Sequence, residues 1–414
     1  MRIKSAGVAV GAALALALTA CGGDAEPAVS DDATIDFDGT LVIWTDEERA
    51  ESLKPVVAEF AAANNITIEV EGIAKDLQDQ FITASEQGEG PDILVQAHDW
   101  IGNLVQNGTI DPVPLTEEQQ AAINPDALRA VTYDGQIYGT PYAMENLALI
   151  RNTDLAPDEP ATLEELVATG QQLKEDGDVD DILSIEVSAD GNPYNAYPFY
   201  ASGGGYLFGQ DADGGYDPTD LGLDKPEAVD AFEKLAWLGE EGAMKTSMGP
   251  EQAIPMFAEG KTPFLVAGPW AMNQINTAGL SYEISPIPAF EGGEKATPFV
   301  GTQTFFVASK GTNKVFAQEF VANFITGTDL ATKLYESDPR PPANLAAAEA
   351  ANATDPNMAK FLAAGEGGYI LPAIPEMQAV WEPFGRAQAS VISGEDPASA
   401  VEAAAKAIND AING

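Results

Sequence analysis

Two glycine-containing segments of the chain are similar to phosphate-binding motifs, and neither motif is complete. Gly260-Lys261-Thr262 ends like a phosphate-binding loop, but Pro255 stands where that loop needs its first glycine. Gly203-Gly204-Gly205 begins like a dinucleotide-binding turn, but Phe208 occupies the place of the third glycine. Because these glycines let the backbone approach phosphate groups closely, the sequence predicts neither a nucleotide site nor a dinucleotide site.

Cysteine and histidine, the usual ligands of zinc, are scarce. Cys21 is the one cysteine and His98 the one histidine, which excludes an intramolecular disulfide and a multi-histidine or multi-thiolate zinc site. Asp176, Asp178 and Asp180 have the spacing of calcium ligands, but the turn glycine and the final glutamate of a calcium loop are absent. We favour a solvated acidic turn there and predict no cofactor. We expect His98 to be a structural histidine with satisfied hydrogen bonds.

Acidic residues dominate the charge of the chain. Asp and Glu total 65 against 20 Lys and Arg, which gives a formal net charge of -45. Nucleic-acid phosphates need a basic surface, so a DNA- or RNA-binding function is excluded. So many carboxylates make chance pairs certain, and the catalytic pair of a glycoside hydrolase can be neither inferred nor dismissed. Hydrophobic residues make up 45% of the chain, which is enough for a packed core.

The amino terminus has the pattern of a secretory signal. A short basic start is followed by an apolar run over residues 6–17, which is too short for a stable membrane span. Leu18-Thr19-Ala20-Cys21 resembles a bacterial lipobox, in which the cysteine becomes lipidated. We therefore expect a signal peptide over residues 1–20 and a flexible acidic tether over residues 21–39, anchored to the membrane through Cys21.

Strand and helix patterns alternate after the tether. Buried strands are expected over residues 40–44, 66–70, 92–95 and 263–267, and helices over residues 47–64, 76–86, 162–174, 226–238, 250–259, 315–324 and 398–411. Thr162 and Glu165 have the spacing of a capping box. Asp134-Gly135 is typical of a two-residue hairpin turn. The alternation predicts an α/β fold with a largely parallel sheet.

Several short motifs occur in one order along nearly the whole chain after residue 40. They are Leu41-Val42-Ile43-Trp44, Gly90-Pro91-Asp92-Ile93, Ala97-His98-Asp99, Pro141-Tyr142-Ala143-Met144-Glu145-Asn146-Leu147, Gly204-Gly205-Tyr206, Phe257-Ala258-Glu259-Gly260-Lys261, Gly268-Pro269-Trp270, Pro298-Phe299-Val300-Gly301, Ile374-Pro375-Glu376-Met377 and Trp381. Together they resemble an extracellular solute-binding protein of the maltose/maltodextrin-binding type. The resemblance implies a two-lobed, periplasmic-binding-protein-like α/β fold with a hinge between the lobes and a sugar site in the cleft.

The resemblance also implies where the lobes begin and end. One lobe is expected to comprise residues 40–145 plus 303–349, and the other residues 146–302 plus 350–414. The chain should cross between them near residues 144–147, 300–303 and 348–352.

The ligand-binding residues of the family correspond to specific positions in this sequence. The aromatic platforms, which cover the C–H faces of a sugar ring, correspond to Tyr194, Trp270 and Trp381. The hydroxyl ligands correspond to Asp99 and Glu145. Further candidates follow the first strand: Asp46, Glu48 and Arg49. Asp46 is explained equally well as a helix cap. Two other tryptophans, Trp44 and Trp237, are expected to belong mostly to the core.

Some positions of the implied site depart from the maltose-binding type. Gln96 stands in place of a stacking tryptophan, Trp100 in place of an arginine, and Asn192 in place of a glutamate. Arg386 lies one position later than expected after Trp381. We keep all four as candidate ligand residues and expect a glycoside site whose particular sugar the motifs do not define.

The resemblance implies a monomeric, lipid-anchored receptor on the extracellular face of the cell membrane. It would bind a malto-oligosaccharide or a related glucoside and deliver it to the membrane permease of an ABC importer, without being an enzyme. Two alternatives stay open: a receptor of the same fold for another solute, and a glycosidase tethered to the surface.

Replacing the lipobox cysteine tests the anchor. Cys21→Ser removes the thiol that would carry the acyl chains, so the variant should be released from membranes into the medium. Fractionation of cells and mass spectrometry of the mature protein measure this. Unlipidated wild-type protein that begins upstream of Cys21 would contradict the prediction.

Overall fold

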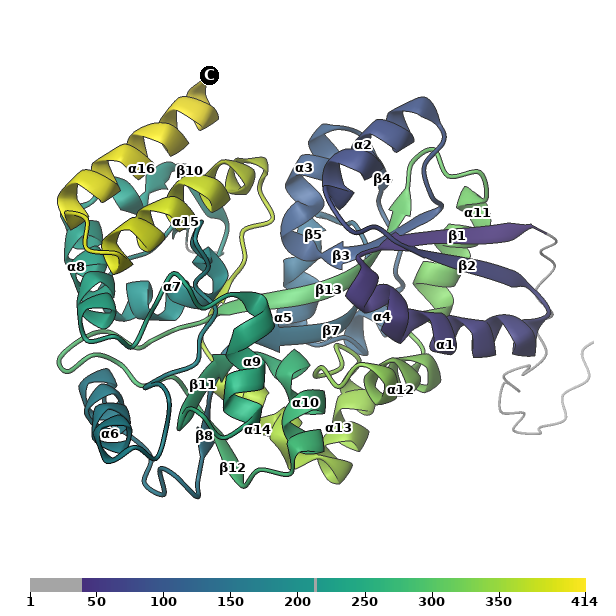
Figure 1. The fold of residues 1–414 in the computed structure, drawn as a ribbon. Helices are drawn as coiled ribbons and strands as arrows, with labels where there is room; N and C mark the ends of the chain where they lie inside the picture. The colour runs from purple at the N-terminus through teal and green to yellow at the C-terminus, as the bar shows by residue number, and fades with distance from the viewer. Residues whose placement is uncertain (1–38, 212–213) are drawn as a thin grey trace, which may run out of the picture. The chain divides into compact units, whose positions relative to one another are not determined.

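A mixed seven-stranded sheet forms the first lobe of the protein (Figure 1). Its strands are β1 (Thr40–Thr45), β2 (Thr67–Gly72), β3 (Ile93–Ala97), β4 (Ile110–Asp111), β7 (Thr140–Asn146), β13 (Phe299–Ala308) and β14 (Tyr369–Ile370). β1 is parallel to β2 and β3, and β14 is parallel to β13. β13 is antiparallel to β3, β4 and β7. The expected largely parallel sheet is therefore only partly right, because β13 arrives from a distant part of the chain rather than through a βα unit.

The computed structural model describes residues 39–211 and 214–414. The expected signal peptide, Cys21 and the tether up to residue 38 lie outside the described residues. The helices of the first lobe are α1 (Glu47–Asn64), α2 (Leu77–Gln87), α3 (Ile101–Gln106), α4 (Glu117–Ala121), α5 (Pro125–Ala130), α11 (Lys314–Glu319) and α12 (Thr328–Ser337). A π-helical turn, Phe320–Phe324, continues α11, where the sequence predicts one helix over 315–324.

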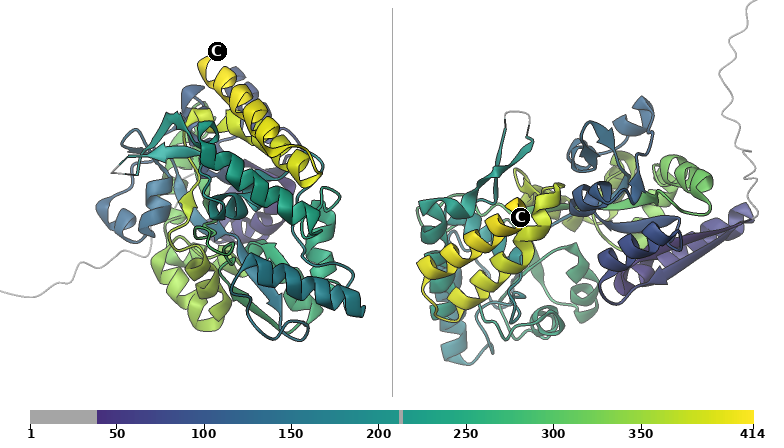
Figure 2. Two further views of the ribbon diagram at one scale, coloured as in Figure 1. Left: turned by 90° about the vertical axis from the view of Figure 1, so that its left-hand side faces the viewer. Right: turned by 90° about the horizontal axis from the view of Figure 1, so that it is seen from above.

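The second lobe is built on a small antiparallel sheet (Figure 1). The two C-terminal helices of the chain, coloured yellow, pack side by side in this lobe (Figure 2). β8 (Ala148–Asn152) lies between β11 (Phe264–Ala267) and β12 (Tyr282–Ser285). The helices are α6 (Leu163–Asp176), α7 (Pro193–Ser202), α8 (Pro226–Glu240), α9 (Pro250–Ala258), α10 (Met272–Ala278), α13 (Leu345–Thr354), α14 (Pro356–Ala364), α15 (Gln378–Ile392) and α16 (Pro397–Asn413). The two-lobed α/β architecture is confirmed.

Two hairpins complete the fold. β5 (Thr132–Tyr133) pairs with β6 (Gln136–Ile137), and β9 (Phe208–Gln210) pairs with β10 (Tyr216–Leu221). The first of these is the hairpin that the sequence predicts. Its turn residues Asp134 and Gly135 have φ values of 48 and 72°, as a two-residue hairpin turn requires.

Two continuous segments link the lobes. β7 belongs to the first-lobe sheet and is followed, after Leu147 alone, by β8 of the second-lobe sheet. β13 begins at Phe299 in the second-lobe core and ends beside Phe306 in the first-lobe core. α12 packs on α1 of the first lobe, whereas α14 packs on β12 of the second, so a further link lies between them around α13. The lobe boundaries and the closing motion stay predictions.

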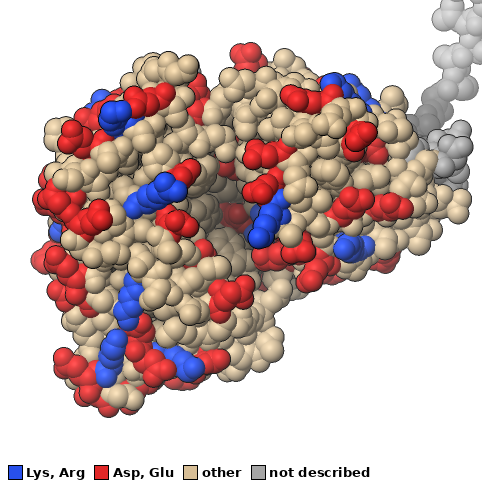
Figure 3. Space-filling model, turned by 45° about the horizontal axis from the view of Figure 1, so that its top comes forward, with Lys and Arg blue, Asp and Glu red and all other residues tan. Residues whose placement is uncertain are grey.

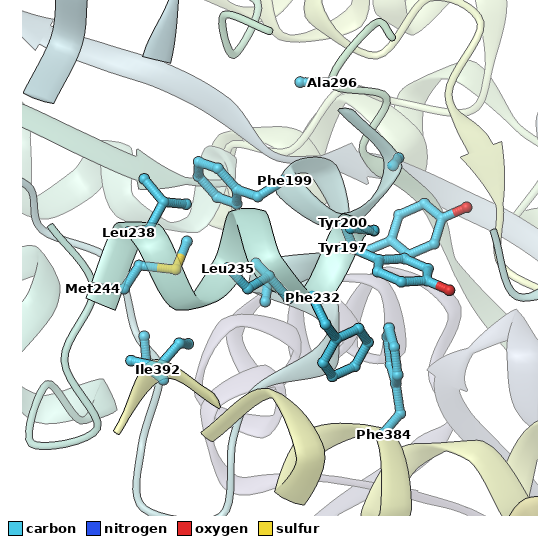
Figure 4. Packing of buried hydrophobic residues seen from close by; sticks show 14 of the residues in the cluster. Tyr197, Phe199, Tyr200, Phe232, Leu235, Leu238, Met244, Ala296, Phe384 and Ile392 are labelled. Carbon is cyan, nitrogen blue, oxygen red and sulfur yellow. The ribbon is translucent and has the colours of Figure 1, made fainter. Parts of the chain in front are cut away.

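The core of the second lobe is rich in aromatic rings. The rings of Tyr200, Phe232 and Phe384 pack edge to face in pairs, with centroids 5.0–5.7 Å apart (Figure 4). They come from α7, α8 and α15, which pack on one another, and α16 covers α8 and α15. Trp237 packs at the edge of this core against Phe290, as expected for a mostly structural tryptophan.

The helices that the sequence predicts occur with bounds close to those expected, but the predicted capping hydrogen bonds of α6 form only in part. The predicted helix over 47–64 is α1 with the same bounds. At α6, the hydroxyl of Thr162 accepts from the N–H of Glu165, as predicted. The carboxylate of Glu165 does not complete the capping box, because it accepts from the N–H of Ala161 instead.

A buried carboxylate joins three segments of the first lobe and can be tested by substitution. Asp92 is 2% exposed and accepts from the backbone N–H of Val42 at 3.0 Å and of Asn313 at 2.6 Å. Asp92→Asn replaces one acceptor by an amide that faces a donor, so it should lower the free energy of unfolding by about 1.5–3 kcal/mol. Urea unfolding measures the loss. The control Glu51→Gln, on the exposed face of α1, should change it by less than about 0.5 kcal/mol. Equal effects would contradict this role for Asp92.

Candidate functional site

A polar network lies where β1 and β3 of the first lobe end. Asp46 caps α1, since its Oδ1 accepts from the N–H of Arg49 at 2.9 Å, and its Oδ2 pairs with the Arg49 guanidinium. Gln96 Nε2 donates to the same Oδ2 at 3.1 Å. Burial alone would raise the pKa of Asp46, but Arg49 lowers it below its usual value. Asp46 is thus both a helix cap and part of a network with two other predicted site residues.

A second polar network surrounds Glu145 on β7. One of its carboxylate oxygens accepts from Gln303 Nε2 at 2.7 Å, and the other pairs with the guanidinium of Arg340. Gln303 reaches Glu145 because β13 pairs with β7, which places Gly301 opposite Glu145. A Cβ at position 301 would lie 3.1 Å from Glu145 Cγ, so the glycine makes room for this carboxylate. Sequence reasoning found Glu145 but missed Gln303 and Arg340.

Aromatic rings of the second lobe lie next to the polar network of Glu145. Trp270 follows β11 in a short 3-10 helix, and its ring centroid lies 5.7 Å from the guanidinium carbon of Arg340. The ring centroid of Tyr194 on α7 lies 6.2 Å from that of Trp270 and 5.8 Å from that of Phe299. The ring centroid of Phe299 lies 6.2 Å from that of Trp381 on α15. The three platforms mapped from the sequence are therefore brought together, with Phe299 as a link that sequence reasoning did not assign.

Polar atoms without protein partners occur within these networks. Arg49 Nε, Gln303 Oε1 and Tyr194 Oη are buried and have no hydrogen-bond partner within the described part of the chain. Buried polar atoms in native proteins are almost always bonded to protein, water or ligand. Unpaired donors and acceptors beside half-buried rings suit a ligand that offers both hydroxyl groups and C–H faces.

Two neighbouring buried groups carry unusual protonation states. The Nδ1 of His98 accepts from the N–H of Thr302 at 3.1 Å, so its Nε2–H donates to the carbonyl of Leu371 at 2.9 Å. This neutral tautomer has both nitrogens bonded, and burial lowers the pKa of His98 to about 4. The expected structural histidine is confirmed. Burial raises the pKa of Asp99 to about 7, with a further increase from Glu145 opposed by Arg49.

The remaining predicted site residues make contacts that a structural role explains. Trp100 is half-buried against the first-lobe core, and Asn192 caps α7 by accepting from the N–H of Asn195 at 3.1 Å. Arg386 is exposed and pairs with Glu382 at 2.7 Å. The side chain of Glu48 is 78% exposed and lies 3.8 Å from Arg340. A role for these four residues in ligand binding stays a prediction.

The described surface is hollowed between the lobes, with acidic side chains in and around the hollow (Figure 3). A cavity of about 360 Å³ is lined by the end of α5, by the β5–β6 and β9–β10 hairpins and by the 368–374 segment, and by no residue of the two polar networks. We place the site at the polar and aromatic networks, because three of the unpaired buried atoms lie there and none belongs to a residue that lines this cavity.

The described residues, 39–211 and 214–414, include no cluster of three His, Cys, Asp or Glu side chains that could hold a metal ion. In the same residues, no helix combines the length and the apolar character that crossing a bilayer requires.

Comparison with known proteins gives matches along most of the chain. The family model for bacterial extracellular solute-binding proteins matches residues 56–360. A galactooligosaccharide-binding protein of Bacillus subtilis is 29% identical, over 95% of this chain and 94% of the relative. A maltodextrin-binding protein of the same organism is 28% identical, over 97% and 94%. A maltooligosaccharide ABC transporter solute-binding lipoprotein of Streptococcus pneumoniae is 26% identical, over 99% and 96%.

The opposite pKa shifts of His98 and Asp99 predict how stability depends on pH. His98, with its pKa lowered from 6.5 to about 4, contributes stability above pH 6.5 that is lost as the pH falls through about 4. Asp99, with its pKa raised from 3.8 to about 7, contributes stability at low pH that is lost as the pH rises through about 7. Between about pH 4 and 6.5 the two groups therefore change the free energy of unfolding with pH in opposite directions, and their effects cancel.

Asp99→Asn removes the contribution of Asp99 to the pH dependence of stability and leaves that of His98. As the pH falls from about 6.5 to 4, the free energy of unfolding of this variant should drop more steeply than that of the wild type, by up to about 1.4 kcal/mol per pH unit. Urea unfolding across this range measures the profiles. Asp126→Asn changes an exposed carboxylate and should keep the wild-type profile. Parallel profiles for Asp99→Asn and the wild type would rule out a raised pKa at Asp99.

Proposed function

The chain belongs to the family of bacterial extracellular solute-binding proteins, and we propose that it is a receptor that binds an oligosaccharide between its two lobes. The observation that carries the proposal is the contact of Trp270 with Arg340, which joins the aromatic rings of the second lobe to the polar network of Glu145. Flat apolar rings cover the C–H faces of a sugar, while paired carboxylates, guanidinium groups and amides bond its hydroxyls.

Ion pairing in the site supports a neutral solute. Asp46 is paired with Arg49, and Glu145 with Arg340, so the central carboxylate of each polar network has a cationic partner. Asp99 is held partly protonated near neutral pH by its raised pKa. A polyamine would need an excess of ionised carboxylates, and an anionic solute an excess of cations. A polyhydroxylated neutral ligand needs neither.

The names of the relatives support the ligand class and the transport role. They include galactooligosaccharide-, maltodextrin- and maltooligosaccharide-binding proteins, and one is named as part of an ABC transporter and as a lipoprotein. In our proposal, Cys21 carries the lipid that holds the receptor at the extracellular face of the membrane. The lobes close on the sugar about the β7–β8 and β13 links, and the monomeric receptor delivers it to a permease. It acts by binding and is not an enzyme.

Binding to a panel of oligosaccharides tests the function. Purified protein lacking the signal and tether is heated with maltotriose, galacto-oligosaccharide or a polyamine, because a ligand that binds only the native state raises the melting temperature. A rise with one of the sugars, followed by recovery of that sugar intact, supports the receptor. Products formed at catalytic rates would favour a tethered glycosidase, and a response to the polyamine alone would favour another solute.

Trp270 is the residue on which the sugar should depend most. Trp270→Ala deletes a large apolar face at the site, so it should weaken binding of the cognate sugar by about 2–4 kcal/mol, or roughly 30- to 900-fold in dissociation constant. Calorimetry measures the affinity, and urea unfolding measures the stability of the same variant. The variant should still fold, because the ring is only partly buried where it packs against the second-lobe core.

Trp237→Ala is the matched control for Trp270→Ala. Trp237 packs on the second-lobe core away from the polar networks, so its loss should lower stability and leave sugar affinity unchanged. Near-normal affinity of Trp270→Ala, together with a large drop in its unfolding midpoint, would mean that Trp270 is a core residue and not a platform.

A further inference from the structure

Arg340 lies on the segment between α12 and α13 and makes more charged contacts than any residue mapped from the sequence. Its side chain is 6% exposed. Its Nε donates to Asp338 at 2.7 Å, its Nη1 pairs with Glu145, and its Nη2 lies 3.8 Å from Glu48. Burial alone would lower the pKa of Arg340, but Glu145 and Asp338 raise it well above its usual value. The guanidinium is therefore permanently charged, and the carboxylates hold its plane in one orientation.

The guanidinium of Arg340 also contacts the ring of Trp270, which belongs to the second lobe. Its central carbon lies over Trp270, 5.7 Å from the ring centroid, which is within the range of a cation–π interaction. The backbone of Gly268 packs against another part of that ring, since a Cβ at this position would lie 2.0 Å from Trp270 Cζ3. Arg340 thus connects two first-lobe carboxylates, Glu145 and Glu48, to the aromatic platform of the second lobe.

We propose that Arg340 is a positioning residue for oligosaccharide binding, which fixes the carboxylate of Glu145 and holds the ring of Trp270 by covering one of its faces. This inference rests on the proposed function, because it assigns Arg340 a part in the same site. The sugar then stacks on the part of the half-buried ring that stays exposed, and the ring is ordered before the sugar arrives. An arginine suits this position better than a lysine, because only a planar guanidinium can pair with carboxylates at its edge and cover a ring with its face.

A double-mutant cycle separates this role from a merely structural one. Arg340→Gln, Arg340→Lys, Trp270→Ala and the combination of Arg340→Gln with Trp270→Ala are titrated with maltotriose, or with galacto-oligosaccharide if the wild type binds only that sugar. Arg340→Gln should weaken binding by about 30-fold, and Arg340→Lys should recover part of the loss. In the Trp270→Ala background the loss from Arg340→Gln should be smaller, because the ring that it positions is gone and only its effect through Glu145 remains.

Tryptophan fluorescence provides a readout that needs no sugar. Arg340→Gln should shift the emission spectrum relative to the wild type, and the same substitution should cause no shift in the Trp270→Ala background. The control Arg129→Gln changes an exposed arginine that pairs with exposed Asp126, so it should alter neither emission nor affinity. If Arg340→Gln does not fold, Arg340→Lys carries the comparison, since it keeps the charge and should still shift the emission and lower the affinity.

The outcomes distinguish this inference from the proposed function. If the wild type binds sugar, three results would overturn the role of Arg340. They are additive losses in the cycle, an unchanged emission spectrum of Arg340→Gln, and tighter sugar binding by Arg340→Gln than by the wild type. A wild type that binds no oligosaccharide would overturn the proposed function, even where the emission shift depends on Trp270.

Discussion

The pairing of β13 with β7 and β3 is the constraint on which the site depends. β13 is buried along all ten of its residues and extends between the cores of the two lobes. Its register sets Gly301 opposite Glu145 and Gln303 opposite Ala143 and Ala97. A shift of one residue would turn every side chain of β13 to the opposite face and separate Gln303 from Glu145. The strand that joins the lobes therefore also positions the polar groups between them.

The buried polar side chains of β13 need hydrogen-bond partners, and some of these come from distant parts of the chain. Thr302, Gln303 and Thr304 are all fully buried. Gln303 bonds to Glu145, and a buried glutamate is costly unless a cation pairs with it. Arg340 supplies that cation from 195 residues further along the chain. Atoms that no protein group satisfies, such as Gln303 Oε1, remain for water or for a ligand hydroxyl.

Local patterns in the sequence were sufficient for the β5–β6 hairpin and for seven helices, because apolar periodicity and turn residues act over a few positions. These helices are α1, α2, α6, α8, α9, α11 and α16, and the other helices of the described residues were not predicted. α1 has the predicted bounds. The antiparallel entry of β13 could not be predicted from local patterns, since a strand's partners depend on contacts far apart in sequence. Arg340 was missed for the same reason. The prolines around it, in Asp338-Pro339-Arg340-Pro341-Pro342, indicate only a stiff extended segment. The platforms were found through the family motifs rather than through periodicity.

The aromatic platform and the second-lobe core form one continuous packing. Trp270 contacts Tyr194, Tyr194 contacts Phe299, and Phe299 stacks on Tyr197 at 3.8 Å with an interplanar angle of 13°. Tyr197 is 1% exposed and belongs to the core cluster. Rings anchored in this way lose little conformational freedom when a ligand covers them, so more of the stacking energy contributes to affinity. In the proposed site, the first lobe contributes carboxylates and guanidinium groups that are held by ion pairs. A rigid apolar surface thus adjoins one rich in ion-paired charges, and a sugar is a solute that can bind to both at once.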